Sequence, residues 1–423
     1  MITRLFIVMV PLATLSARAD SGFADYASGF YTRGLETGTY LDQGSGIINP
    51  FYIPVQAWSV VPRVTLTLTH DNNIFLSADD PEESTTLAVV PGVLMLYGRP
   101  DHHHLYLDAS LKIKPYDSSG NLEGLNDRLL TIGAARITPR SILGASAGYR
   151  YTESADTLVG QRIVKEDVIL MLDGEQKISA KSSLGVSGST EWNDYEDPEL
   201  TDYRRWSADV RLYQQSTPNS DVYVALGVGE DNSDAPDELG DFEFYNASLG
   251  FRGRQTPKVT MDGSVGYEWR ERKDDNDDDT AGNWISSLGI NYTPTGFLMF
   301  YFNVDAEVRP AVNSLGQSTF DQRYTLGATR RLFSERLRGN ASAFIGNVDY
   351  TGTAPAGQER NQDREDEYWG YNLGLDYFTT KDISIGLTYS YFDNTGMTQG
   401  TEEEKRNAAY DSGQWVLRLS WNY

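Results

Sequence analysis

The chain has 423 residues, which is enough for one large domain or for two or three ordinary ones. Its 60 acidic and 36 basic residues give a formal net charge of -24, which argues against nucleic-acid binding because that function requires a basic surface. The chain has no Cys, which excludes disulfides, thiolate metal sites and a Cys nucleophile.

The N-terminus has the three parts of a secretory signal peptide, predicted for residues 1–19. Arg4 supplies the positive charge, residues 5–15 (LFIVMVPLATL) form the apolar region, and residues 17–19 form an A-x-A cleavage site, so the mature chain is expected to begin at Asp20. The apolar region is too short to span a bilayer, and no later stretch approaches about 18 consecutive apolar residues. The sequence therefore predicts an exported protein that is not held in a membrane by helices.

Residues 20–61 form a separate segment between the signal peptide and the regular pattern that follows. Its first half is rich in Gly, and Pro50, Pro54 and Pro62 argue against a helix over the second half. Three interpretations are open: a plug inside a barrel, a periplasmic docking segment, or a flexible leader.

From residue 62 to the end, apolar residues alternate with polar ones. In the segment 104–114 (HLYLDASLKIK) every odd position is apolar, and in the final segment 414–423 (QWVLRLSWNY) the odd positions from Trp415 to Tyr423 are again apolar. A helix would need periods of three and four, so the pattern predicts strands. About eighteen such segments follow one another, each of roughly 10–14 residues.

The connections between these segments alternate in length. Short connections such as residues 98–101 (GRPD) and 138–140 (TPR) alternate with long acidic ones such as 230–241 (EDNSDAPDELGD) and 271–282 (ERKDDNDDDTAG). A soluble β-sandwich has no reason to lengthen every second loop. A propeller would show a repeating blade motif, and the sequence shows none. The predicted fold for residues 62–423 is therefore all-β: a transmembrane antiparallel β-barrel of about 18 strands (16–18), with short periplasmic turns and long acidic extracellular loops.

Closure of a barrel explains why the chain ends within an apolar strand. The last strand is expected to pair with the first, which places Trp421 and Tyr423 in the aromatic girdle at the periplasmic interface. Such a strand also resembles the assembly signal that the bacterial barrel-insertion machinery recognises, although Tyr423 stands where Phe is usual. That machinery is therefore an expected partner.

The stretch at residues 67–77 (TLTHDNNIFLS), followed by residues 85–96 (TTLAVVPGVLML), carries a family resemblance. The Asp71-Asn72-Asn73 strand tip and the Pro91 within the next strand resemble the start of the putative β-barrel porin 2 family of Gram-negative outer-membrane proteins. The order of strands and loops resembles that of the family over roughly residues 60–423, whereas the motif covers only this stretch. The resemblance implies an outer-membrane location, and for some members an association with exopolysaccharide export and its components.

Polar residues on the inward phase of the predicted strands are the candidates for lining a lumen. The functional interpretation is a polar eyelet with Tyr rings that stack on sugars, and the structural interpretation is a set of cross-strand charge pairs that stiffen the wall. A barrel of this size leaves a lumen that side chains cannot fill. The candidates are Arg150, Arg211, Arg252, Arg331, Arg338 and Arg418; Asp108, Asp209, Asp262, Asp305, Glu307 and Asp376; and Tyr106, Tyr213, Tyr223 and Tyr301.

Arg331 and Arg338 flank one short turn and are expected to lie nearly opposite each other on the inner face. Like charges in that position are costly unless an anion joins them. The pair could hold an anionic solute or partner at the periplasmic mouth, or it could contact phospholipid phosphates, which is the interpretation we favour.

No cofactor, metal site or catalytic set is predicted. The acidic loops lack the EF-hand pattern; the favoured interpretation is that they are solvated, and loose divalent-cation binding beside lipopolysaccharide is the alternative. Only His70 lies near the outer rim, and its phase faces lipid, so an outer-membrane enzyme is disfavoured. The predicted function is an outer-membrane channel for hydrophilic solutes or for export of an exopolysaccharide. The alternative is a structural or surface-binding barrel that contacts capsule or lipopolysaccharide without transport. Outer-membrane lipid and lipopolysaccharide are the expected surroundings, and the acidic loops predict a preference for cations.

Overall fold

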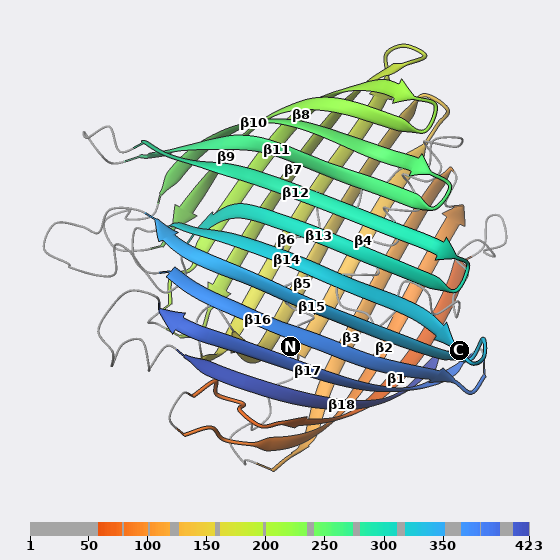
Figure 1. Cartoon of the computed structure of the whole chain (residues 1–423), viewed down its shortest axis with the longest axis vertical. Coiled ribbons are helices and arrows are strands. Elements are labelled where there is room, and N and C mark those ends of the chain that lie inside the picture. Colours follow the sequence, from red (N-terminus) through yellow and green to blue (C-terminus); the bar gives the residue numbers. More distant parts are fainter. Residues whose placement is uncertain are drawn as a thin grey trace, which may run out of the picture.

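The structure is a computed structural model, and Figure 1 shows the whole chain. It describes residues 58–77, 80–99, 102–118, 127–156, 161–197, 200–234, 241–273, 280–310, 318–351, 365–380, 382–397 and 409–422. The predicted signal peptide, residues 20–57 and Tyr423 lie outside these ranges, so the three interpretations of the N-terminal segment and the placement of Tyr423 stay predictions.

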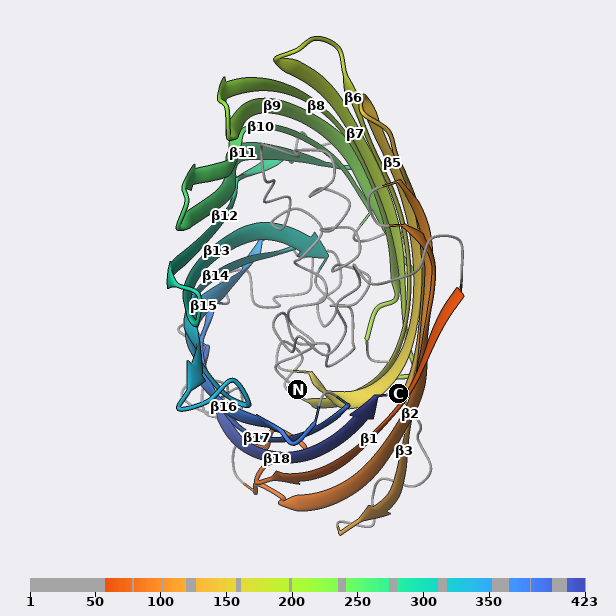
Figure 2. The same ribbon diagram turned by 90° about the vertical axis from the view of Figure 1, so that its right-hand side faces the viewer.

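Eighteen antiparallel strands form one sheet that closes on itself, because β1 pairs with both β2 and β18 (Figures 1 and 2). The closed all-β barrel is confirmed. The first nine strands are β1 (Trp58–Asp71), β2 (Ser84–Arg99), β3 (His103–Asp117), β4 (Asp127–Ile137), β5 (Ser141–Asp156), β6 (Gln161–Lys177), β7 (Ser182–Tyr195), β8 (Tyr203–Thr217) and β9 (Ser220–Ser233). The other nine are β10 (Phe242–Thr256), β11 (Val259–Arg272), β12 (Thr280–Thr295), β13 (Leu298–Pro310), β14 (Ser318–Leu332), β15 (Leu337–Thr351), β16 (Glu365–Phe378), β17 (Ile383–Met397) and β18 (Tyr410–Asn422).

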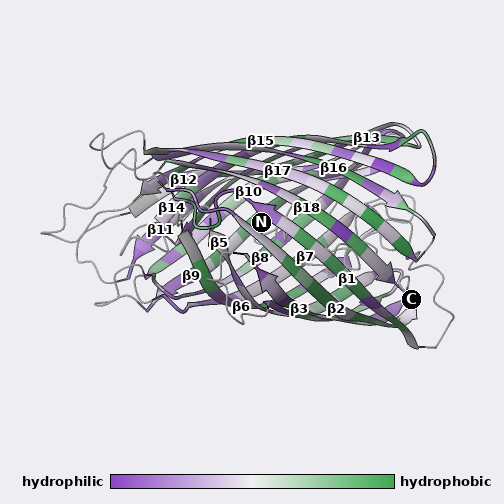
Figure 3. Cartoon of the chain, turned by 90° about the horizontal axis from the view of Figure 1, so that it is seen from below, coloured by the Kyte–Doolittle hydropathy of each residue, from purple (hydrophilic) through white to green (hydrophobic). Residues whose placement is uncertain are grey.

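The two-residue period of the sequence gives the barrel wall an apolar face and a polar face. In β18 the odd residues from Trp415 to Trp421 are 42–48% exposed, and Arg418 between them bonds to the acid Asp376 of β16. Figure 3 shows the same alternation of apolar and polar residues along the other strands. Because hydrocarbon accepts large apolar side chains and rejects charges, the exposed apolar face is the lipid-facing outer face.

The Asp71-Asn72-Asn73 motif joins the end of β1 to the start of β18. Asn72 exchanges two hydrogen bonds with the backbone of Gly413, with lengths of 2.6 and 3.1 Å, and the Asn73 amide donates to the carbonyl of Asp411 at 2.9 Å. The Asp71 carboxylate accepts two further bonds from β18 side chains. The motif therefore fastens the seam of the barrel at its extracellular end.

Strand β1 begins at Trp58, within the segment that was expected to precede the barrel. Pro62 is tolerated there because β1 pairs with β18 only from Arg63 onwards, so the missing N–H of Pro62 has no partner to lose on that side. Pro91 in β2 pairs with Val64 of β1, but it has no partner in β3, where the paired residues pass from Val89 to Gly92. Both prolines occupy positions where the ladder does not need their N–H.

The barrel is elongated in cross-section, as Figure 2 shows along its axis, and the wall turns tightly around β6 to β9. At this curved end, inner side chains from strands that are not neighbours in the sheet can approach one another.

Within the described ranges, no helix has the length and apolar character needed to cross a membrane.

Replacing Leu417 with Arg should cripple insertion into lipid. Leu417 is 47% exposed on the outer face, and Arg at the bilayer midplane costs about 2–4 kcal/mol there. The matched variant Val416→Arg places the same charge on the inner face and should fold with nearly the wild-type yield. Gel mobility of unheated samples after folding into phosphatidylcholine vesicles measures both yields, and equal yields would contradict the assignment of faces.

Candidate channel lining

The inner face carries ion pairs that reach across an intervening strand. Arg63 of β1 bonds to Asp108 of β3 over Gly92 of β2, with one Nη1–Oδ2 distance of 3.2 Å. A Cβ at Gly92 would lie 2.8 Å from Nε of Arg63. The glycine therefore leaves the path open for the pair.

The predicted candidate Arg418 is held in the same way. Its guanidinium lies 2.8 Å from the carboxylate of Asp376, and Gly386 of β17 lies between them in register. A Cβ at Gly386 would lie 2.5 Å from that carboxylate. Arg150, another candidate, bonds through Nε to Asp167 at 2.8 Å.

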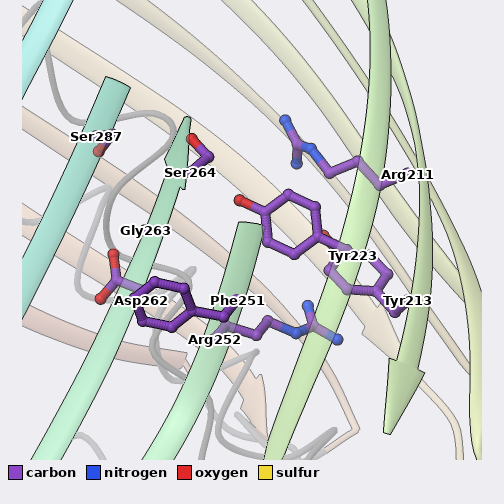
Figure 4. Close-up of a pocket in the computed structure, with 9 residues that line it drawn as sticks. All are labelled: Arg211, Tyr213, Tyr223, Phe251, Arg252, Asp262, Gly263, Ser264 and Ser287. Atoms are coloured by element: carbon purple, nitrogen blue, oxygen red, sulfur yellow. The ribbon is translucent and has the colours of Figure 1, made fainter. Parts of the chain in front are cut away.

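Four neighbouring strands, β8 to β11, bring five of the candidates to one pocket, which Figure 4 shows in close-up. These candidates are Arg211, Tyr213, Tyr223, Arg252 and Asp262. Phe251, Gly263, Ser264 and Ser287 complete its lining. Nothing in the spacing of these residues along the chain predicted that they would meet, because their convergence depends on the register of the sheet.

Arg252 has several charged and aromatic partners in this pocket. Its two terminal nitrogens each lie 2.9 Å from a carboxylate oxygen of Glu175, and its Nε donates to Asp221 at 3.1 Å. Its guanidinium also lies 3.7 Å from the ring centre of Tyr213. Glu175 belongs to β6, four strands away, so this contact bridges the tightly curved end of the barrel.

Arg211 has a lighter set of partners. Its Nη2 lies 3.3 Å from Oδ2 of Asp209, a carboxylate that also accepts a bond from the Ser187 hydroxyl at 3.0 Å. Arg211 and Asp209 were both candidates, and they lie on the same face of β8 two residues apart.

Three of the predicted tyrosines lie flat against the wall. At each one, a Cβ added to a glycine of the next strand would overlap the phenol ring. Each ring therefore fills the space of a missing side chain, and glycine at these positions serves close packing. The pairs are Tyr106 with Gly133, Tyr223 with Gly250 and Tyr301 with Gly327.

Two acidic candidates lie on the inner face of β13. Asp305 accepts a bond of 3.5 Å from the hydroxyl of Ser287 and lies opposite Arg323 in register. Glu307 pairs with Arg309 two residues on. Both carboxylates are therefore adjacent to a donor or a cation.

Arg331 and Arg338 are cross-strand partners in the β14–β15 register, as expected, but their side chains have separate partners. Arg331 is exposed and bonds to Glu335 within the turn at 2.6 Å. Arg338 is buried, lies 5.5 Å from the ring centre of Phe378, and is opposite Asp376 in the β15–β16 register. An anion bridging the two guanidiniums is thus not needed to offset their repulsion.

A buried arginine at the extracellular end was not among the predicted lining residues. Arg270 is 1% exposed, and its guanidinium bonds to Glu268 and Asp231, both at 2.8 Å, while it lies 5.2 Å from the ring centre of Phe244. The inward phase of β11 that includes Asp262 extends to Arg270, so that phase was the signal available. It was obscured by the acidic loop that follows.

A second overlooked feature is an aromatic cluster on β15 to β18 near the extracellular end. The rings of Tyr368, Phe392 and Tyr410 stack on neighbouring strands, with both centroid distances 5.9 Å and interplanar angles of 21° and 24°. Leu76, from the β1–β2 connection, is buried in the same cluster. The connection therefore folds inward against the wall.

No group of three or more His, Asp or Glu side chains in the described ranges is arranged to hold a metal ion.

The sequence matches the family model described as Putative beta-barrel porin 2 over residues 49–410. The chain belongs to this family. The match covers most of the chain and agrees with the resemblance found at the first strands, so the protein is a porin-like barrel of the bacterial outer membrane. A search of the curated proteins found no match.

Among solved structures, the chain is similar to the outer membrane protein OpdK from Pseudomonas aeruginosa, with 12% identity, a TM-score of 0.44, and coverage of 86% of this chain and 99% of that chain. It is similar to OccAB4 from Acinetobacter baumannii, with 11% identity, a TM-score of 0.44, and coverage of 89% and 100%. The corresponding values for OccAB3 from Acinetobacter baumannii are 9%, 0.46, 86% and 99%.

Replacing Arg252 with Ala should lower the free energy of unfolding by about 3–5 kcal/mol, because it leaves the buried Glu175 carboxylate without its cation. The matched control is Arg331→Ala, which removes an exposed pair and should cost no more than about 1 kcal/mol. Urea titrations in lipid vesicles measure both variants. Equal losses would show that the Arg252 cluster does not stabilise the wall.

Proposed function

We propose that this outer-membrane protein is a passive channel for small hydrophilic solutes. The observation that carries this proposal is the lining: an eighteen-strand ring whose inner face holds ion pairs such as Arg63–Asp108, Arg150–Asp167 and Arg418–Asp376. Barrels of this size enclose an aqueous lumen, and a wall of compensated charges offers water and polar solutes a favourable surface.

Features at the extracellular end support small solutes over polymers. The β1–β2 connection packs Leu76 against the aromatic cluster on one side of the mouth. On another side, the end of β13 lies against inner side chains of β8 and β11, since its Val308 carbonyl accepts bonds from Arg205 and Arg270. Both elements narrow the passage.

Export of an exopolysaccharide is the second candidate, together with contacts to export components. The observation that favours it is the group of flat phenol rings on the inner wall, including Tyr223 and Tyr301, because flat aromatic surfaces stack on sugars. Block of the ion current by neutral oligosaccharides added on the periplasmic side would support this candidate. A pore that excludes all but the smallest sugars would count against it.

We also propose that lipopolysaccharide and outer-membrane lipid are the protein's surroundings and that it acts as a channel rather than an enzyme. The assembly machinery that reads the terminal strand is proposed as its partner during insertion. A structural barrel that contacts capsule without transport is the remaining alternative, and it predicts no stepwise conductance in planar bilayers.

The channel should prefer cations at low salt and lose this preference at high salt. The net charge of the chain is -24, and the ion pairs of the lining largely offset each other, so the excess negative charge should dominate the field at the mouth. The Debye length falls from about 10 Å at 0.1 M salt to about 3 Å at 1 M, which screens that field. Reversal potentials across KCl gradients measure the preference.

A variant with Asn in place of the five aspartates at 274, 275 and 277–279 should show a smaller cation preference at 0.1 M KCl while its conductance at 1 M stays unchanged. Anion preference of the unmodified protein at 0.1 M would contradict the charge argument, and absence of conductance would contradict the channel itself.

A further inference from the structure

The pairing of β12 with β13 stops early at the extracellular end. Its last pair is Ser286 with Ala306, although β12 continues to pair with β11 as far as Thr280, and β13 continues to pair with β14 as far as Pro310. The outer ends of the two strands are therefore unpaired with each other, and the β13 end curves into the interior in Figure 2.

Inner side chains of β8 and β11 hold this end of β13 and the start of β14. The carbonyl of Val308 accepts bonds from Arg205 of β8 at 2.9 Å and from Arg270 of β11 at 3.2 Å. The hydroxyl of Ser318 lies 3.2 Å from Arg270. Val308 and Ser318 are 1% and 3% exposed, although both lie on the outward phase of their strands.

The sequence of β13 nevertheless fits a position in the wall. Val304, Ala306 and Val308 continue an apolar outward phase to the end of the strand. If the register of Ser286 with Ala306 continued, Trp284 would meet Val308 on the outer face and Asn283 would meet Arg309 on the inner face. This pairing requires no bulge. It would place the apolar residues toward lipid and the polar residues toward the lumen.

We propose that the ends of β13 and β14 (residues 307–310 and 318–320) form a gate with two positions. In the tucked position seen here, the gate narrows the lumen and is held by Arg205 and Arg270. In the paired position, residues 307–310 pair with residues 282–285 of β12, which completes the wall and widens the lumen. The Val308 carbonyl exchanges guanidinium donors for backbone donors, and Arg270 keeps Asp231 and Glu268 as partners in both positions.

Because the chain has no Cys, two introduced Cys residues can form an intramolecular disulfide only with each other. In the double variant Asn283→Cys/Arg309→Cys, the two thiols lie on facing positions of the same side only when the gate is paired, and cross-strand neighbours meet the distance that a disulfide needs. Oxidation with copper phenanthroline in planar bilayers should link them and raise the single-channel conductance. Dithiothreitol should reverse both changes.

Two matched pairs control this experiment. Ser286→Cys/Ala306→Cys lies on the outer face of the part of the seam that is already paired, so it should link without a change in conductance. Asn283→Cys/Val308→Cys places the thiols on opposite faces and should not link. The gate is contradicted if the 283–309 pair stays unlinked while the 286–306 pair links, or if the 283–309 pair links and the conductance stays the same.

Arg205→Gln in the 283–309 background should raise the linking rate by about tenfold, because it removes one charged donor from the tucked position. Arg204→Gln is its control, since Arg204 is an exposed neighbour on the outer face and does not hold the gate. Equal linking rates in the two variants would contradict the role of Arg205 as a holding residue.

Discussion

Backbone hydrogen bonding in lipid is the constraint on which the structure depends. A strand edge that faces hydrocarbon would leave its N–H and C=O groups without partners, so the sheet must close, and β1 therefore pairs with β18. The Asp71-Asn73 motif adds side-chain bonds where the two strands leave the ladder, which is where the closure would otherwise fray. The early end of the β12–β13 pairing lies at the extracellular end, where water is available to unpaired groups.

Closure also decides how charge is arranged. Alternate residues of every strand face one lumen, so cations and acids on strands that are not neighbours come within bonding distance. Glycines make this possible at Gly92 and Gly386, where a side chain would block the pair. The same tight curvature that brings Glu175 to Arg252 builds the pocket at β8 to β11. The lining thus results from closure of the barrel and from glycines at the positions that the ion pairs cross.

The fold could be predicted from the sequence because period, strand length and loop alternation are local properties of the chain. The inward phase of candidates such as Arg418 and Arg252 could be followed in the same way. The partners of these residues could not be predicted. The contact between Arg252 and Glu175 depends on four successive strand pairings and on the bend of the wall. The tucked end of β13 was also unpredictable, because its alternation is that of an ordinary wall strand, and its outward-phase Val308 is buried in the interior.

Single-Cys labelling in a bilayer tests most directly whether one face of each strand lines a water-filled lumen. Ser187 bonds to Asp209 on the inner face, and the adjacent Val186 is 50% exposed on the outer face. A cationic methanethiosulfonate should modify Ser187→Cys and lower the single-channel conductance, and it should leave Val186→Cys unchanged. Modification of Val186→Cys with Ser187→Cys protected would contradict the account.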